Sequence, residues 1–543
     1  MKRKAVAAVL TAVMVASMFT GCGSDNGSSS AKSTSAASAA NDTVDEDGKV
    51  NGIMYQEGLP LVDEGDYTFS IFCDDSSESG EFIMLDEFKK QTNVDVDLKI
   101  YPYETATERL NLDLNSGDYA DVIGGWTLSD NAILTYGVNQ GVFIPLEDYF
   151  EKYCPNISAI LDLPGVREKM TAPDGHIYTI PYVCADTTVG YSPYINTKWL
   201  ENVGMSMPTT TDEFEAVLKA FKEQDANGNG DASDEIPFST DPNNKHIEAM
   251  AGYFGLPMNK LGIAIQDEKV VYGGVSDTYR EFLSWFHKLY AEGLVDVELY
   301  TQDSSTWEGK GNQDLYGVSI AYGSNEFTGI PAAEERGDFD SMPVLNTDKD
   351  GIWLRDTEGF SVYRTQAVIT NKAEHPEIIC RWFDNAFALE NGIGCNRGPV
   401  GVIVNKEDDG YHAIDTTTLS EEDQEKYSWS NLWPQSLPKY LPVDFEFVEE
   451  HPMYDEKKAT EEAYEANLTK EIIPSYWIDL DKIDTFSDTN TAIKDFFEQQ
   501  QAQFVCGELD IDNDADWQAY VDGMYSLGLE DWVATQGIEE IAK

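Results

Sequence analysis

An alternation of short apolar strands with amphipathic segments between residues 67 and 123 constrains the fold most strongly. Residues 67–72 (YTFSIF) and 94–100 (VDVDLKI) alternate apolar and polar side chains as strands do, and residues 121–123 (DVI) form a third short strand. The intervening segments, 81–91 and 105–114, are predicted to be helices. Because parallel strands need a crossover connection, usually a helix, this order predicts an α/β fold with a mainly parallel sheet flanked by helices.

The rest of the chain predicts further lobes of mixed strands and helices. A chain of 543 residues is too long for one hydrophobic core and predicts two or three compact lobes. Residues 177–182 and 187–192 have the pattern of strands that cross into a second lobe. Further helices are predicted over 212–223, 277–292, 375–390 and most of 489–543, and further strands over 317–323 and 359–370.

The first 22 residues have the three parts of an export signal. Lys2, Arg3 and Lys4 precede an apolar run over residues 5–19, and small residues precede Cys22. The run is shorter than the about 20 residues that span a bilayer. Residues 19–22 (FTGC) resemble a bacterial lipobox, which implies a signal peptide over 1–21, lipidation of Cys22 and anchoring at the extracytoplasmic face of the membrane. The alternative is an ordinary secreted protein.

The segment after Cys22 is predicted to be a flexible linker over residues 22–65. Residues 23–44 are rich in Ser, Gly and Ala and have almost no apolar side chains, so they cannot offset the entropy cost of ordering. No later stretch has the length and apolar character of a second membrane span.

Charge and cysteine content exclude several classes of protein. A net charge of −61 argues against nucleic-acid binding, which needs Lys and Arg, and predicts a soluble monomer held to the membrane by lipid alone. Of the seven cysteines, the six after Cys22 are scattered without a CxxC pair, which excludes a disulfide-rich scaffold. Buried free thiols are expected, and one or two disulfides stay open.

Five segments, in order, resemble the extracellular solute-binding proteins of ABC importers, in the carbohydrate-binding group related to maltose-binding protein. They are residues 116–123 (SGDYADVI), 175–181 (GHIYTIP), 194–200 (YINTKWL), 208–214 (PTTTDEF) and the strand near Tyr322. The resemblance implies a type II periplasmic-binding-protein-like fold of two lobes joined by a hinge, with the solute bound in the cleft between them. We expect lobe 1 to comprise 66–183 and 359–425, and lobe 2 to comprise 186–358 and 426–543. ABC permease subunits are the implied partners.

Residues 225–235 (DANGNGDASDE) predict a structural calcium site. Their first half matches the D-x-[DN]-x-[DN]-G pattern of an EF-hand, whereas the twelfth position, normally glutamate, is Ile236. The acidic residues Asp234 and Glu235 instead precede Ile236 directly. This arrangement resembles the loop of alginate- and oligosaccharide-binding members of the family. The expected ligands are side-chain oxygens of Asp225, Asn227, Asn229, Asp234 and Glu235, and a backbone oxygen of Asp231. A plain Asx/Gly surface turn is the alternative.

Aromatic platforms and hydrogen-bonding side chains at strand ends are the candidates for holding a sugar. Sugars offer apolar faces that stack on aromatic rings and hydroxyl rims that need polar partners. The chain has 11 Trp and 28 Tyr, most of which must fill cores, and we assign Trp285 and Trp382 to the core. The candidate ligand-binding residues are Asp74, Trp126, Tyr182, Asp186, Tyr322, Asn325 and Arg397.

An enzyme is the alternative from another class. A glycoside hydrolase needs two carboxylates across a cleft, and 98 acidic residues make such a pair uninformative. The chain has no HExxH zinc motif, no GxSxG elbow and no P-loop, and its six histidines do not pair at metal-ligand spacing. We therefore predict a non-enzymatic protein that binds a carbohydrate, most simply an oligosaccharide because the chain is long. A cell-surface glycan adhesin is a third interpretation.

Overall fold

A computed structural model describes residues 42–75, 81–241, 246–329, 338–414, 416–448 and 452–542, all of which belong to one compact unit of the chain. The predicted signal peptide, Cys22 and the beginning of the predicted linker lie outside these residues. In the described part of the chain no helix combines the length and apolar character that crossing a membrane requires.

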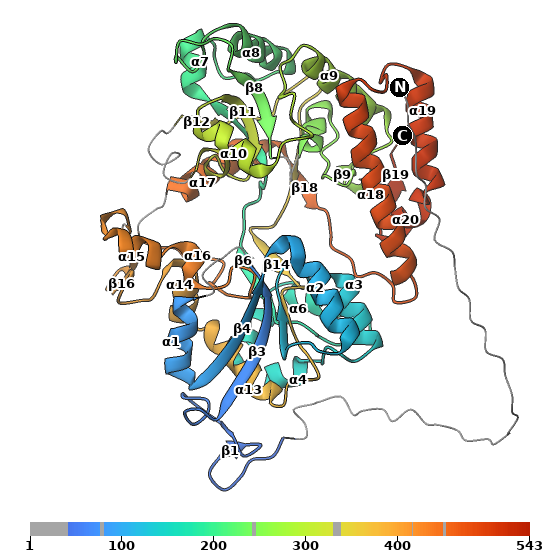
Figure 1. The fold of residues 1–543 in the computed structure, drawn as a ribbon. Coiled ribbons are helices and arrows are strands. Elements are labelled where there is room, and N and C mark those ends of the chain that lie inside the picture. The colour runs from blue at the N-terminus through green and yellow to red at the C-terminus, as the bar shows by residue number, and fades with distance from the viewer. Residues whose placement is uncertain are drawn as a thin grey trace, which may run out of the picture. The chain divides into compact units, whose positions relative to one another are not determined.

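The predicted N-terminal sheet is confirmed (Figure 1). Its strand order is β15-β5-β3-β4, where β3 (Tyr67–Asp74) runs parallel to β4 (Val94–Tyr101) and to β5 (Val122–Gly124). β15 (Ala367–Ile369) returns from far along the chain and pairs antiparallel with β5. The connecting helices are α1 (Ile83–Thr92) and α2 (Tyr103–Ser116).

Alternate side chains of β3 enter different cores, so this sheet is buried on both faces. Phe69 and Ile71 join a cluster with Phe88 of α1 and Trp382 of α13 (Pro376–Ala386), while Phe72 joins a second cluster with the α2 side chains. The predicted core position of Trp382 is confirmed, since this side chain is fully buried. The short helices around this sheet are α3 (Asp130–Ala132), η2 (Ile133–Asn139), α4 (Glu147–Tyr153), α5 (Pro155–Leu161) and α6 (Val166–Met170).

The second large sheet is mixed, whereas a mainly parallel sheet was predicted. Its order is β12-β7-β11-β8, and only β8 (Ile236–Thr240) and β11 (Tyr316–Ala321) run parallel. β7 (Ser192–Asn196) pairs antiparallel with both β11 and β12 (Phe339–Ser341), because it enters this sheet directly from the crossing segment.

Helices from distant parts of the chain share the core of this second sheet (Figure 1). α8 (Thr211–Glu223) and α9 (Asp277–Ala291) bury their apolar stripes in it, and Trp285 packs against it half-buried. The C-terminal helices α18 (Ile483–Cys506), α19 (Asp514–Ser526) and α20 (Leu529–Thr535) complete it, and α18 ends at Gly507 as predicted. The remaining elements here are α7 (Thr197–Val203), η3 (Ile247–Phe254), β9 (Ile263–Gln266), β10 (Lys269–Tyr272), α10 (Ser304–Asn312), α11 (Asn325–Thr328) and β19 (Glu540–Ile541).

Two segments lie in the first core although the sequence assigned them elsewhere. Residues 42–65 were predicted to belong to the flexible linker, but they form the pair β1 (Lys49–Val50) and β2 (Met54–Tyr55), and Val50 and Met54 are fully buried. Trp433 and Leu437 were predicted in lobe 2 but are buried beside Trp382. Their large apolar side chains gain more by burial than a surface position offers.

The chain passes between the two core regions several times. β6 (Tyr182–Ala185) pairs antiparallel with β14 (Phe360–Tyr363), and β13 (Trp353–Arg355) pairs parallel with β18 (Leu468–Ile472). The remaining elements are α14 (Leu389–Arg397), β16 (Val404–Glu407), β17 (Gly410–Ala413), η4 (Thr416–Thr418), α15 (Glu421–Lys426), α16 (Trp429–Leu432), α17 (Pro452–Tyr464) and η5 (Glu465–Asn467).

The six cysteines in the described residues are free. Cys73, Cys154, Cys380 and Cys395 are buried, Cys184 is half-buried and Cys506 is exposed. The structure therefore agrees with the expected buried thiols and contains no disulfide among these residues.

Candidate functional site

The antiparallel pair of β6 and β14 presents a set of polar and aromatic side chains on one face. Tyr182 is opposite Tyr363 and Cys184 is opposite Ser361 in the register. Side chains alternate between the faces of a strand, so Asp186, just beyond β6, shares their side. We call these five residues the crossing face. The other side, including Val183, packs into the first core.

Trp126 extends the crossing face with an exposed ring. Its centroid lies 5.4 Å from that of Tyr363, edge to face, and 6.5 Å from that of Tyr182. The Tyr182 and Tyr363 rings are themselves 5.4 Å apart. Trp126 is 46% exposed, whereas Tyr182 and Tyr363 are half-buried, so the cluster offers mainly the indole ring to solvent. Burial raises the pKa of Tyr363 to about 12, so its phenol stays protonated at neutral pH.

Asp74 lies beneath Trp126 and does not reach solvent. It is fully buried, and its two carboxylate oxygens accept hydrogen bonds from the backbone N–H groups of Trp126 (2.9 Å) and Thr127 (2.6 Å). The intervening Gly125 has φ +129°, and a Cβ there would lie 2.2 Å from the carboxylate. The sequence predicted Asp74 as a ligand residue; its contacts are those of a residue that positions the Trp126 loop.

Asp186 joins the crossing face to the second core. Its carboxylate accepts hydrogen bonds from the Thr187 backbone N–H (2.8 Å), the Tyr322 hydroxyl (3.2 Å) and the Ser361 hydroxyl. Tyr322 follows β11, so this contact brings together residues 136 positions apart in the sequence. Of the predicted ligand residues, Trp126, Tyr182, Asp186 and Tyr322 are therefore gathered in one cluster.

Charged residues of α17 hold the loops that carry these side chains. Lys457 donates to the backbone oxygens of Gly190 (2.8 Å) and Tyr322, and its Nζ lies 4.0 Å from the centroid of the Tyr322 ring. Burial lowers the pKa of Lys457 to about 8. On the same helix, Glu456 accepts from the backbone and hydroxyl of Ser324.

Two further aromatic rings adjoin Tyr322. Tyr191 lies 6.0 Å from it, edge to face, and stacks on His246 with centroids 3.9 Å apart. The His246 Nε2 is buried and has no hydrogen-bond partner among the residues that the structure describes, and burial lowers the pKa of this imidazole to about 4. The ring is therefore neutral at physiological pH.

The other two predicted ligand residues lie on helices α11 and α14. Asn325 is half-buried at the first position of α11, after the Tyr322 loop. Arg397 ends α14, with its guanidinium 6.0 Å from the Phe447 ring.

Sequence reasoning missed several members of the cluster. Ser361 and Tyr363 could have been found, because residues 359–370 were predicted as a strand and alternation would have placed them together. Lys457, Tyr191 and His246 carry no such signal in the sequence.

A pocket of about 410 Å³ lies next to this cluster and contains none of the predicted ligand residues. Its lining mixes apolar and polar side chains, and Asp130, Tyr476 and Gln536 are among the polar ones. Arg364, which follows Tyr363, binds the Asp130 carboxylate through Nε (2.8 Å) and Nη2 (2.5 Å) and the Tyr476 backbone oxygen through Nη2 (2.7 Å).

The predicted calcium loop curls back on itself and is held by hydrogen bonds between its own residues. Gly228 (φ +75°) and Gly230 (φ +94°) make the curl, and the Gly230 N–H donates to Asp225 Oδ2 (3.0 Å). Asn229 donates through Nδ2 to Asp234 Oδ2 (2.7 Å). Two buried carboxylate oxygens, Asp225 Oδ1 and Glu235 Oε2, have no hydrogen-bond partner within the described part of the chain, and burial raises the pKa of Glu235. Such orphaned oxygens suit a cation, which would supply the missing partner.

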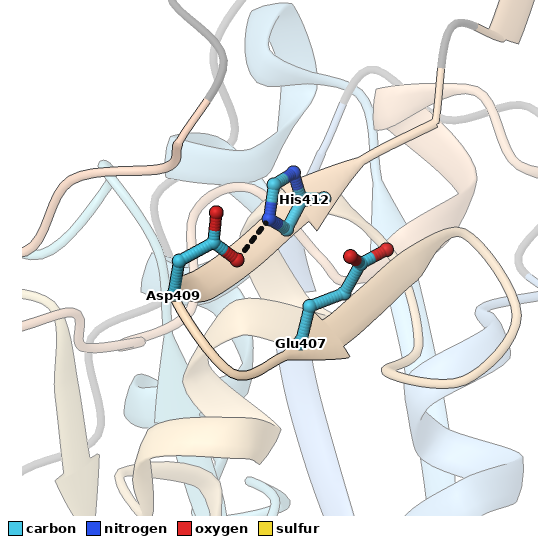
Figure 2. Close-up of side chains that lie close together, drawn as sticks. All are labelled: Glu407, Asp409 and His412. Atoms are coloured by element: carbon cyan, nitrogen blue, oxygen red, sulfur yellow. Dashed lines mark hydrogen bonds and ion pairs between the residues drawn. The ribbon is translucent and has the colours of Figure 1, made fainter.

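A second group of acidic side chains lies at the tip of the β16–β17 hairpin (Figure 2). Glu407, Asp409 and His412 have ligand atoms within 4.8 Å of one another, and the Asp409 carboxylate accepts a hydrogen bond from His412 Nε2 at 2.9 Å. Both acids are exposed, and solvated carboxylates of this kind are common without a metal.

The sequence model of the bacterial extracellular solute-binding proteins matches residues 76–392. The fructooligosaccharide ABC transporter substrate-binding protein FusA of Streptococcus pneumoniae is 33% identical over 335 residues, which are 60% of this chain and 61% of FusA. Lipoprotein LipO of Bacillus subtilis is 28% identical over 280 residues, 50% of this chain and 52% of LipO. The matched regions thus span less than two thirds of these curated relatives.

Solved structures match over more of the chain. FusA of S. pneumoniae in complex with kestose has a TM-score of 0.76 and 26% identity, covering 86% of this chain and 98% of that chain. An EF-hand mutant of FusA in complex with fructo-nystose has a TM-score of 0.74 and 26% identity, with the same coverage of 86% and 98%. The alginate-binding protein AlgQ2 has the same fold, with a TM-score of 0.69 at 22% identity over 88% of this chain and 99% of that chain. The predicted type II periplasmic-binding-protein-like fold is confirmed.

Proposed function

This chain belongs to the family of bacterial extracellular solute-binding proteins, and on that premise we propose that it captures an oligosaccharide reversibly and delivers it to ABC permease subunits. The observation that carries the proposal is the exposed Trp126 ring, packed on the half-buried Tyr182 and Tyr363 beside the hydrogen-bonding pair Asp186 and Tyr322. Flat rings suit the apolar faces of sugars, and adjacent carboxylate and hydroxyl groups suit their rims. The oligosaccharides bound by the FusA relatives support this class of solute.

We propose that the two core regions are two lobes that close over the sugar. The β6–β14 pair would then act as the hinge, because it connects the cores and carries the crossing face. The burial of Trp433 and Leu437 in the first core favours a boundary for lobe 2 beyond residue 437, later than the predicted residue 426.

We propose that no covalent bond is broken in the bound sugar. Hydrolysis of a glycoside needs a carboxylic acid free to protonate the leaving oxygen and a second carboxylate opposite it. Asp186 is the carboxylate of the crossing face, and it already accepts three hydrogen bonds from the protein. The substrate-binding roles named for the relatives favour the same interpretation.

We propose that the protein is monomeric and lipid-anchored through Cys22 at the extracytoplasmic face of the membrane. The lipobox-like segment at residues 19–22 supports this proposal, and LipO, a lipoprotein, is a relative. Labelling with a palmitate analogue tests it, since Cys22→Ser should abolish incorporation and leave the protein in the soluble fraction.

We propose that residues 225–235 bind a structural calcium ion. Side-chain oxygens of Asp225, Asn227, Asn229, Asp234 and Glu235 and a backbone oxygen of Asp231 would hold it. The orphaned oxygens of Asp225 and Glu235 support the assignment, and the EF-hand named in a FusA structure indicates such a loop in a relative. The Asn202 side chain fastens the loop to α7 by donating to the Ala226 backbone oxygen (2.8 Å), which favours a role in stability.

Titration calorimetry against a panel of fructo-, malto-, xylo- and alginate oligosaccharides tests the proposed function. We expect saturable binding of at least one sugar with one site per chain, and recovery of that sugar unchanged after incubation. Trp126→Ala should weaken binding without lowering the unfolding temperature. Shortened products would favour the hydrolase alternative, and the absence of any binding would contradict the proposal. Permease genes beside the coding gene would argue against an adhesin.

A further inference from the structure

Only two tryptophans of this protein are exposed, although it has 11, all of them in the described part of the chain. Trp126 is 46% exposed and Trp429, at the start of α16, is 56% exposed. A single exposed apolar side chain is ordinary on a protein surface. Trp429 differs from that ordinary case because buried charged and polar groups hold it in place.

Two consecutive residues at the end of β3, Asp74 and Asp75, each hydrogen-bond to a segment that carries one of the exposed tryptophans. Asp74 fixes the backbone of Trp126 and Thr127. Asp75, only 2% exposed, accepts a hydrogen bond from the backbone N–H of Gln435 (2.7 Å). The two loops that carry the exposed tryptophans are therefore tied to the same strand end.

The side chain of Gln435 continues this connection to Trp429. Its Nε2 donates to the backbone oxygens of Trp429 and Trp433, both at 2.8 Å, and its Oε1 accepts from Lys439. Gln435 is 7% exposed, and its backbone N–H, its Nε2 and its Oε1 all form hydrogen bonds within the protein. The loop around Trp429 is thus fixed by a buried amide, which limits how far the exposed ring can move.

Lys439 lies against the ring of Trp429. Its Nζ is 5.1 Å from the ring centroid, a cation–π geometry, although the lysine is only 4% exposed. Burial lowers the pKa of Lys439 to about 8, and the negative charge of Asp75 opposes that shift. Through Gln435 and Asp75, Lys439 and Trp429 are thus connected to the end of β3 that also supports Trp126.

We propose that Trp429 is a second sugar platform, separate from Trp126, and that the solute is an oligosaccharide long enough to place one ring on each tryptophan. Lys439 and Gln435 are positioning residues, which hold the indole without touching the sugar. This inference rests on the proposed function, because it assigns a second subsite to the same bound solute. It also gives a reason for an exposed indole that is supported by a buried ammonium ion.

The test is calorimetry with a length series of the sugar that binds in the panel, with kestose, nystose and longer inulin oligosaccharides as the first series. Trp429→Ala should bind the shortest member within about twofold of the wild-type affinity and the longer members about three- to tenfold more weakly, the loss expected for one aromatic contact. Trp126→Ala should weaken the binding of every member of the series. Trp429→Phe, which keeps a ring, should retain most of the affinity for long chains.

Tyr525→Ala is the matched control, since Tyr525 is 41% exposed on α19 in the other core. It should change binding at no length. Iodide quenching gives a second measurement that a purely structural role would not affect. A long oligosaccharide should protect one fewer tryptophan in Trp429→Ala than in the wild type.

The outcomes separate the two proposals. If the wild-type protein binds no oligosaccharide, the proposed function fails and this inference fails with it. If the wild type binds and Trp429→Ala matches it at every length, the second platform alone is overturned. A loss that is equal for short and long sugars also overturns it, because Trp429 would then belong to the same subsite as Trp126.

Discussion

The carboxylate of Asp74 holds the backbone of Trp126, although the two residues are 52 positions apart in the sequence. One oxygen accepts the Trp126 N–H and the other accepts the N–H of Thr127, while Gly125 leaves the space that the carboxylate fills. A buried carboxylate that accepts two backbone N–H groups is a rigid support. This support explains how an indole can be both exposed and fixed in orientation.

Asp74→Asn should weaken that support. An amide has one acceptor oxygen, so its NH₂ group would face one of the two backbone donors and leave it unsatisfied. We expect the free energy of unfolding to fall by about 1–3 kcal/mol and sugar affinity to fall with it. Denaturant unfolding and calorimetry measure both quantities. Asp97→Asn, at an exposed position of β4, is the control and should change stability by less than about 0.5 kcal/mol. Wild-type values for Asp74→Asn would contradict this role.

Lys457→Met should lower sugar affinity more than stability. The ammonium group donates to the Gly190 and Tyr322 backbone oxygens and lies over the Tyr322 ring, so its loss should loosen that side of the site. Methionine fills a similar volume and removes the cost of burying a charge, which offsets the lost hydrogen bonds. Calorimetry and thermal unfolding of the same samples test this. Lys458→Met, at the exposed neighbouring position, should behave as wild type. An unchanged affinity for Lys457→Met would refute the role of this lysine.

His246 should make the protein less stable as the pH falls below neutrality. Burial lowers the pKa of His246 to about 4 in the folded state, from an ordinary value near 6.5. The unfolded chain therefore gains a proton at higher pH than the folded protein does. The free energy of unfolding should decline as the pH falls from about 6.5 to about 4 and should be insensitive to this group above that range. His246→Phe should remove this part of the pH dependence while keeping the stack on Tyr191.

The comparison for that experiment is His412→Gln, because His412 lies on the β16–β17 hairpin beside Asp409. Urea unfolding of the wild type and of both variants across this pH range shows whether His246 contributes to the pH dependence of stability. Equal slopes of stability against pH in wild type and His246→Phe would show that the imidazole does not contribute as expected.

Calcium should raise the unfolding temperature, and a chelator should lower it. An ion at about 100 times its dissociation constant adds about 2.7 kcal/mol of stability if it binds only the folded state. Asp225→Asn and Glu235→Gln should abolish the calcium-dependent shift, because they neutralise the carboxylates with orphaned oxygens. Asp409→Asn, in the hairpin group of Figure 2, should retain it. A shift that survives in Glu235→Gln and disappears in Asp409→Asn would move the site to the hairpin.

Local patterns were enough to predict the first sheet and the main helices. The alternation of side chains in β3 and β4 reflects burial of a strand surface, and the breaker at Gly507 reflects a left-handed backbone at a helix end. The same reasoning placed aromatic and acidic residues at strand ends, where Trp126, Tyr182, Asp186 and Tyr322 are found together. Strands, helices and the residues at their ends depend on neighbours in the sequence, so sequence patterns can predict them.

Only the tertiary structure decided which distant segments meet. In the structure Tyr182 pairs with Tyr363, and Lys457 lies against the Tyr322 ring. Asp74, a predicted ligand residue, is buried there and supports the backbone of Trp126. The tertiary structure also buried Trp433 in the first core instead of the second. These outcomes follow from contacts made across long stretches of chain, whose free energy depends on how whole elements pack together. No periodicity within one segment records that packing, and the sequence alone therefore left these residues unassigned or misplaced.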